Sequence, residues 1–136
     1  MGWMMADGGW FGWSFERVGL LFTGIAFLFL WIQVALLHWN GAYHRWQMWV
    51  PVGFGPILGL VGIGAAIYLY APAVYVLFGL GAVVGLVGLY YHFRAIGYYI
   101  TGYSLRNFIA GPPPVLPMMF TALSVLGLLA TYWAVR

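Results

Sequence analysis

Three histidines, His38, His44 and His92, are the side chains of this chain that could take part in the widest range of chemistry. A neutral imidazole can coordinate the iron of a haem or the magnesium of a chlorophyll. Each histidine lies at the end of a long apolar segment or in a short link between two such segments. The sequence therefore predicts ligands near a membrane surface, provided that the segments bring them to the same side.

The composition indicates that these segments lie in lipid. Of the 136 residues, 65% are hydrophobic and only 5% are charged. A soluble domain carries roughly 25% charged residues, so this chain could not cover a water-exposed globule. We expect a single integral membrane domain over residues 1–136. The five arginines are scattered along the chain, and scattered charges argue against a nucleic-acid-binding surface.

Four segments are long and apolar enough to cross a bilayer, which requires about 20 helical residues. Ala71-Pro72 separates the second segment from the third by a tight turn, because a proline disfavours helix in the residue before it. A longer link ends in three consecutive prolines, through which no helix can pass. The sequence predicts an all-α, antiparallel up-down bundle of four transmembrane helices joined by short links and one interfacial loop. The predicted spans are 18–37, 48–70, 73–91 and 115–134, with the interfacial loop at 95–114.

Four crossings place both termini on one side of the membrane and all three histidines on the other. The loop side also holds Arg45, Arg94 and Arg106, whereas the terminal side holds two arginines and both acidic residues. Positively charged loops tend to stay in the cytoplasm. We therefore expect cytoplasmic loops and external termini, in the inner membrane of a bacterium. On the terminal side, Glu16 is expected to pair with its neighbour Arg17.

The first hypothesis for the histidines is a cofactor site. His38 and His92 lie on different spans at similar depth, so they could sandwich one haem b or hold a (bacterio)chlorophyll, with His44 as a third candidate ligand. Arg45 and Arg94 would then be placed to pair with propionate groups. Against this hypothesis, cytochrome-like bundles carry their histidines well inside the spans, and this chain has none there.

Two other interpretations of the histidines remain open. Together with Met48, the three imidazoles could hold zinc or copper, although no acidic residue lies on that side to orient them. Alternatively, they could be interfacial residues that bond lipid headgroups, the loop backbone or a partner subunit. The absence of cysteine excludes thiolate metal sites and covalently attached haem.

Glycines are expected to govern how the helices pack, because lipid removes the hydrophobic drive between them. The second and third spans each carry glycines at i, i+4 and i+7, and this spacing places them on one helical face. We expect the two stripes to meet each other, or one of them to receive a flat cofactor or a neighbouring helix. The stripes are Gly55, Gly59 and Gly62, and Gly81, Gly85 and Gly88.

The spans contain no charged residue in their interiors, and charged residues are what usually mark a transport pathway. Their interior polar groups are Thr23, Gln33, Thr121 and Ser124, which could be simple hydrogen-bond partners between helices. No nucleophile elbow or phosphate loop is present, so we do not expect an enzyme.

The sequence predicts an accessory or anchor subunit of a larger respiratory or photosynthetic electron-transfer complex, with lipids and other membrane subunits as partners. The alternative is a small transporter or lipid-handling protein that self-associates through its glycine stripes.

Overall fold

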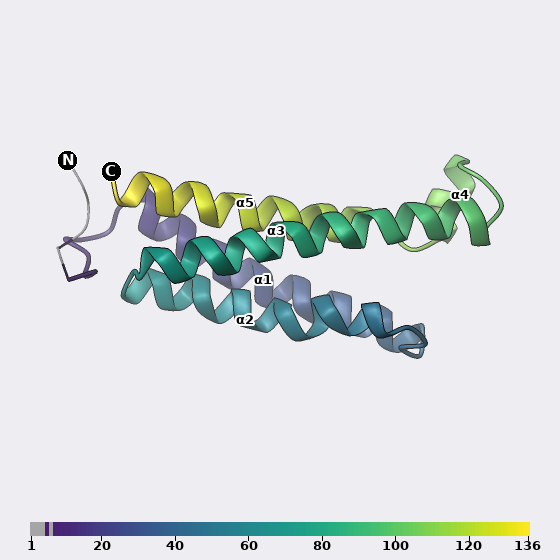
Figure 1. The fold of residues 1–136 in the computed structure, drawn as a ribbon, viewed down its shortest axis with the longest axis horizontal. Coiled ribbons are helices and arrows are strands. Elements are labelled where there is room, and N and C mark those ends of the chain that lie inside the picture. The colour runs from purple at the N-terminus through teal and green to yellow at the C-terminus, as the bar shows by residue number, and fades with distance from the viewer. Residues whose placement is uncertain (1–4, 6) are drawn as a thin grey trace.

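The computed structural model describes residues 5 and 7–136, and Figure 1 shows them as a bundle of long helices, with the start of the first long helix and the C-terminus at the same end. Residues 1–4 and 6 of the predicted domain lie outside the described part. A 3₁₀ turn at Trp46–Met48 leads into the second long helix, and a π turn at Ala95–Tyr99 prolongs the third. The α-helices are α1 (Phe15–Asn40), α2 (Trp49–Ile67), α3 (Ala71–Arg94), α4 (Leu105–Ala110) and α5 (Val115–Ala134).

The predicted four-helix membrane bundle is confirmed. In the described part of the chain, four helical segments are long and apolar enough to cross a bilayer, at Phe15–Asn40, Trp46–Ile67, Ala71–Tyr98 and Val115–Ala134. The first begins at Phe15 because the hydroxyl of Ser14 accepts a hydrogen bond from the backbone N–H of Arg17 at 3.2 Å, which caps the helix.

The third span was predicted to end at residue 91, and its helix continues beyond that residue. The helical segment continues to Tyr98, so the first part of the predicted interfacial loop 95–114 is helix. The chain becomes more polar at His92 and Arg94, but no proline interrupts it there. A change in polarity marks where a helix leaves the lipid, whereas only a backbone feature ends the helix itself.

The four long helices associate as two pairs, α1 with α2 and α3 with α5. A Cβ atom added at Gly62 of α2 would lie 2.6 Å from the Cα atom of Gly24 in α1. One added at Gly85 of α3 would lie 2.7 Å from the backbone nitrogen of Thr121 in α5. The expectation that the two glycine stripes meet each other is therefore wrong. Each stripe instead receives a different neighbouring helix, which was the other outcome considered.

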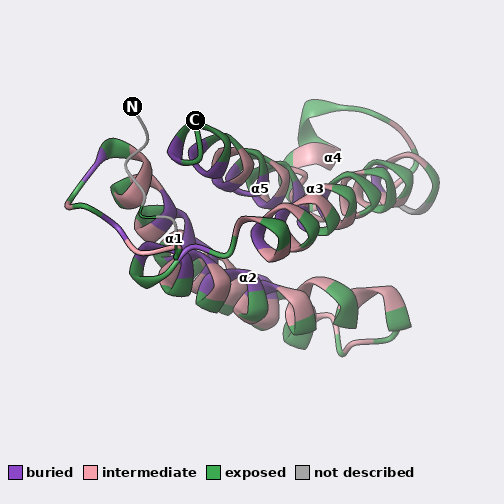
Figure 2. Cartoon of the chain, turned by 60° about the vertical axis from the view of Figure 1, so that its left-hand side comes forward, coloured by how far each residue is buried: buried purple, intermediate pink, exposed green. Residues whose placement is uncertain are grey.

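Phenylalanine rings join the two pairs in the middle of the bundle. The ring of Phe27 in α1 meets that of Phe120 in α5 edge-on, with 5.0 Å between centroids, and lies 5.9 Å from that of Phe78 in α3. All three side chains are buried, whereas the outward faces of the helices are exposed (Figure 2). Those exposed faces are largely apolar, as a lipid-facing surface must be.

The segment before α1 closes the end of α2, whose last carbonyl groups have no partner within the helix. Trp10 donates its indole N–H to the carbonyl of Ala65 at 2.9 Å, and Arg17 donates Nε–H to the carbonyl of Ala66 at 2.8 Å. A second N–H of Arg17 bonds the carbonyl of Gly12 at 3.1 Å. The predicted pairing of Glu16 with Arg17 is therefore wrong, and the buried Oε2 atom of Glu16 has no hydrogen-bond partner among the described residues.

Gly85→Val should destabilise the bundle by about 1–3 kcal/mol, because its side chain would be forced into the backbone of α5. Gly79→Val is the matched control on α3, since nothing lies within 4 Å of a Cβ atom added at Gly79. Unfolding in mixed micelles, followed by circular dichroism, measures both. Equal losses at the two positions would contradict the proposed pairing of α3 with α5.

Arg17→Met should cost about 1.5–3 kcal/mol, the range for a hydrogen bond made by a charged group, because it leaves the end of α2 uncapped. Arg136→Met is the control. Its guanidinium lies 4.6 Å from the ring centroid of Tyr132, and an exposed cation–π contact contributes only about 0.5–1 kcal/mol. The measurement is the thermal unfolding midpoint in detergent. An Arg17 variant with the same midpoint as the Arg136 variant would show that the cap does not contribute to stability.

Candidate cofactor-binding site

The structure places His38 and His92 at the same end of the bundle, the loop end (Figure 1). His38 lies in the last turn of α1 and His92 in the last turn of α3. Both helices run from the terminal end to the loop end, so their last turns emerge on the same side (Figure 1). Both imidazoles are half-buried.

The ring of His92 is held by the backbone. Its Nδ1 atom lies 3.0 Å from the carbonyl oxygen of Pro113, in the proline run before α5. A carbonyl oxygen only accepts hydrogen bonds, so Nδ1 must carry the proton. In the neutral ring, Nε2 then keeps its lone pair. Histidines that bind metals are commonly oriented by such a bond from the other ring nitrogen.

The ring of His38 differs from that of His92 in this respect. The Nδ1 atom of His38 is buried and has no hydrogen-bond partner among the described residues. The phenol ring of Tyr43 lies 6.2 Å away, centroid to centroid, and Tyr43 also stacks on Trp49 at 4.2 Å. One side of the imidazole is therefore shielded by aromatic rings. A buried polar atom without a partner calls for an explanation, and ligand binding is one.

The turn that places Tyr43 near His38 has an unusual backbone conformation. Ala42 and Tyr43 have positive φ angles of 58° and 46°, a backbone conformation that costs about 1–2 kcal/mol per residue outside glycine. The turn carries the phenol of Tyr43 back over α1, where its hydroxyl donates a hydrogen bond to the carbonyl of Ala35 at 2.9 Å.

His44 does not join the other two histidines. Its ring is exposed, and its Nδ1 atom bonds the carbonyl of Gly41 at 2.8 Å within the α1–α2 turn. Among the residues described, no three His, Cys, Asp or Glu side chains are grouped closely enough to hold a metal ion. The hypothesis of a three-histidine zinc or copper site is therefore wrong, because the tight turn ties His44 to its own backbone.

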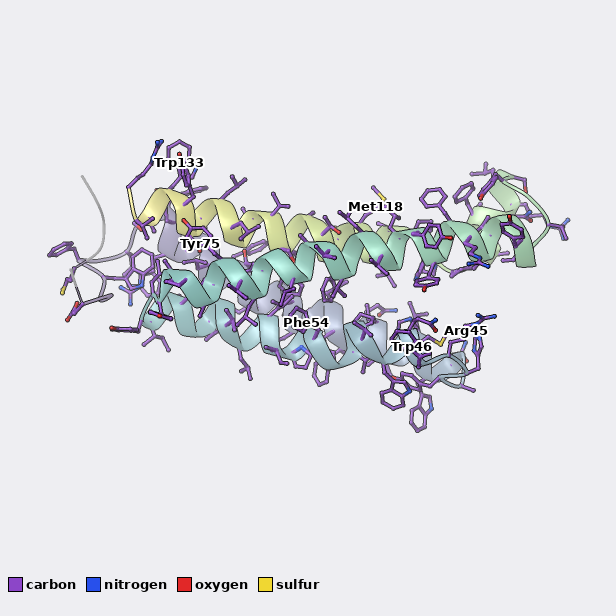
Figure 3. The ribbon with its side chains drawn as sticks, in the orientation of Figure 1. Arg45, Trp46, Phe54, Tyr75, Met118 and Trp133 are labelled. Atoms are coloured by element: carbon purple, nitrogen blue, oxygen red, sulfur yellow. The ribbon has the colours of Figure 1, made fainter. Side chains whose placement is uncertain are left out.

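The loop end is positively charged. Arg45, labelled in Figure 3, is exposed in the α1–α2 turn, and Arg94 is exposed at the end of α3 with its guanidinium 5.8 Å from the ring centroid of Tyr98. Arg106 is exposed on α4. Both acidic residues of the chain, Asp7 and Glu16, lie near the other end. The charge at the loop end therefore favours anionic groups such as propionates or phosphates.

Two groups that shape this site were missed from the sequence. The carbonyl of Pro113 orients His92, and the side-chain amide of Asn107 holds the loop by donating to the carbonyls of Ile100 and Gly102 at 3.1 and 2.7 Å. The role of Asn107 could have been expected from its position three residues after Ser104. This is the spacing of a helix cap, and the Ser104 hydroxyl caps α4 by accepting a hydrogen bond from the Asn107 N–H. The proline run indicated a helix break, but not which residue its carbonyls would bond.

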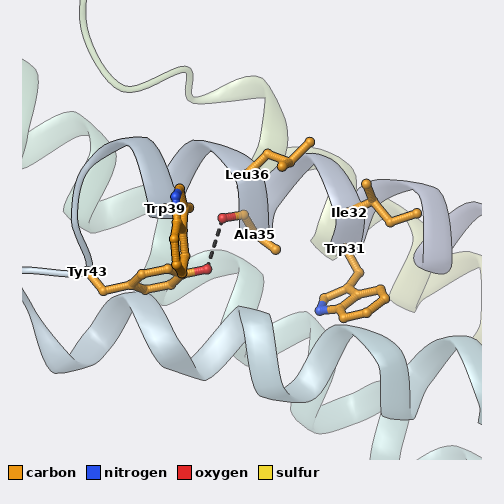
Figure 4. A pocket seen from close by; sticks show the side chains of 6 residues that line it. All are labelled: Trp31, Ile32, Ala35, Leu36, Trp39 and Tyr43. Carbon is orange, nitrogen blue, oxygen red and sulfur yellow. Dashed lines mark hydrogen bonds between the residues drawn. The ribbon is translucent and has the colours of Figure 1, made fainter.

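A small apolar hollow lies on α1 near this end (Figure 4). It has a volume of about 250 Å³ and is lined by Trp31, Ile32, Ala35, Leu36, Trp39 and Tyr43. Sites for drug-sized ligands usually span about 300–1,000 Å³ and contain placed polar groups. The hollow alone is therefore too small for a tetrapyrrole.

Comparison of the chain with protein-family models, with curated proteins and with solved structures finds no match.

The His92 ring should be found as the neutral tautomer protonated at Nδ1. Two-dimensional ¹H–¹⁵N NMR of protein labelled at histidine nitrogens distinguishes the two tautomers. A His92 ring protonated at Nε2 instead would contradict the bond to Pro113.

Proposed function

We propose that this chain is a non-catalytic anchor subunit of a respiratory or photosynthetic electron-transfer complex, and that it holds one haem b or (bacterio)chlorophyll through His92. The observation that carries the proposal is the bond between the Nδ1–H of His92 and the carbonyl of Pro113. It leaves Nε2 with the lone pair that an iron or magnesium ion requires.

His38 is the second ligand in the haem form of the proposal. Its position at the same end of the bundle as His92 and its unpartnered Nδ1 atom support this role. A chlorophyll magnesium would need His92 alone. Arg94 and Arg45 lie at the same end of the bundle and are suited to pair with the anionic edge of a haem. His44 is assigned no role, because its ring is tied to the α1–α2 turn.

The proposal of partner subunits is supported by the surface of the loop end. Trp39, Trp46 and Trp49 are 75%, 72% and 56% exposed, and large aromatic side chains are enriched in the contact surfaces of proteins. The homo-oligomeric transporter has less support, because the glycine stripes that it would use already contact α1 and α5.

An absorption spectrum of the natively purified assembly tests the proposal, with the other chains identified by mass spectrometry. A Soret or (bacterio)chlorophyll band should be present in the wild type and in His44→Ala, and lost in His92→Gly. Because His92→Gly opens a space where the imidazole stood, added imidazole should restore the band. A lone, stable monomer without a chromophore would refute the proposal.

A further inference from the structure

Exposed aromatic side chains mark the depth of the two membrane surfaces on the bundle. Trp39 on α1 is exposed and comes twelve residues after Phe27, a helical rise of about 18 Å. Towards the other surface, Trp133 on α5 is exposed and comes thirteen residues after Phe120, a rise of about 20 Å. The contacting rings of Phe27 and Phe120 therefore lie about midway between two aromatic belts. Indole rings favour the headgroup layer, and a bilayer with its headgroups is about 40–45 Å thick.

The end of α3 continues beyond the belt on the loop side. Arg94 comes sixteen residues after Phe78, a rise of about 24 Å, and the π turn that follows carries the chain further. α4 packs back on this turn, since a Cβ atom added at Gly111, directly after α4, would lie 2.7 Å from Cδ1 of Ile100. Figure 1 shows α4 and the end of α3 reaching past the α1–α2 turn. This segment, residues 95–110, is named the α3–α4 hairpin, and it lies outside the hydrocarbon.

The α3–α4 hairpin is held in one shape by its own contacts. The side-chain amide of Asn107 donates to two carbonyl groups of the turn before α4, at 3.1 and 2.7 Å. The rings of Phe93, Tyr103 and Phe108 lie 5.7–6.5 Å apart, centroid to centroid. A surface that is ordered in advance loses little conformational freedom when it binds a partner.

Apolar side chains nevertheless face outward from this hairpin. Leu105 and Ile109 are 78% and 77% exposed, and their spacing of four residues makes them neighbours on the surface of α4. Tyr98 and Tyr103 are exposed as well. Single exposed apolar residues are normal on any surface, but four within twelve residues and outside the hydrocarbon indicate a contact with another protein.

The charge of the loop end indicates what kind of surface fits there. Arg106 follows Leu105 on α4 and is exposed, and Arg94 is exposed at the end of α3. Both acidic residues of the chain, Asp7 and Glu16, lie at the opposite end of the bundle. No acidic side chain of this chain therefore offsets the positive charge beside α4. Because complementary charge steers association and suppresses wrong partners, the matching surface is acidic.

We propose that the α3–α4 hairpin is the docking site for the extramembrane part of a partner protein, at an apolar depression rimmed by carboxylates. Leu105 and Ile109 enter the depression, and Arg106 pairs with a carboxylate at its rim. The proposal rests on the anchor role proposed above and adds the chemistry of the partner surface. A phospholipid surface is the less favoured occupant, because helices that bind one lie within the headgroup layer, whereas α4 lies beyond the aromatic belt.

Spin labels show which medium surrounds the hairpin, and the chain has no cysteine of its own to interfere. In vesicles of phosphatidylcholine and phosphatidylglycerol, labels at Leu105→Cys and Ile109→Cys should be relaxed by a water-soluble nickel chelate and little by oxygen. Leu60→Cys is the control, since Leu60 is 66% exposed within the α2 span and should show the reverse. Hairpin labels relaxed mainly by oxygen would place α4 in lipid and overturn the proposal.

Photo-cross-linking in native membranes tests the partner. A benzophenone amino acid at position 105 or 109 should capture one and the same protein, identified by mass spectrometry, through a peptide that contains Asp or Glu. Position 60 should not capture it. Arg106→Glu should lower the capture several-fold, whereas Arg106→Lys should retain it. Arg136→Glu, at the opposite end of the bundle, is the control for charge and should also retain it.

Leu105→Ser should weaken capture from position 109 by about 5- to 30-fold, as expected when one anchoring side chain is lost. Capture of a second copy of this chain, of lipid alone or of no protein would overturn the proposal, and so would capture that Arg106→Glu leaves unchanged. The absorption spectrum of the same membranes is a separate readout. Leu105→Ser should leave it as in the wild type, so docking and the cofactor site can fail independently.

Discussion

Hydrocarbon supplies no hydrogen bonds, and this constraint determines the structure of the chain. Backbone groups are satisfied within helices, and the helices approach closely enough at glycines such as Gly62 and Gly85 to gain contact without a hydrophobic drive. Where a helix ends, its free carbonyls need another partner. Trp10 and Arg17 fill that role at the end of α2. At the opposite end of the bundle, the carbonyl of Pro113, in the proline run before α5, accepts a hydrogen bond from the ring of His92.

This constraint separates the two ends of the molecule chemically. At the terminal end, the polar side chains of Trp10 and Arg17 are used to close the backbone of α2. At the loop end, the backbone instead holds a side chain, the imidazole of His92, through its Nδ1 atom. A hydrogen bond from one nitrogen of an imidazole links two parts of the structure, and it also orients the ring as it does in histidines that bind metals. The chemistry of this chain is expected at a membrane surface for that reason.

The sequence was sufficient to predict the four spans, the common side of the termini and the side on which the histidines lie, because these follow from the length and number of apolar segments. It could not predict which helices pair. The spacing of Gly55, Gly59 and Gly62 shows that they share a face, but not that α1 covers it. Likewise, Gln33 and Thr121 are both polar residues within spans. Thr121 bonds α3 and Gln33 faces outward, because the rotation of each helix is set by packing rather than by composition.

The position of the histidines also limits what a bound tetrapyrrole could do. A cofactor on His92 would lie near the loop side, and the bundle between it and the other surface contains buried rings such as Phe27 and Phe78 but no further histidine. One such cofactor could exchange electrons with a partner on the loop side, yet it could not carry them across the bilayer by itself. Transfer across the membrane would therefore require a cofactor in a neighbouring subunit. That requirement follows from the proposed ligand alone, and it agrees with an anchor role rather than an independent catalytic one.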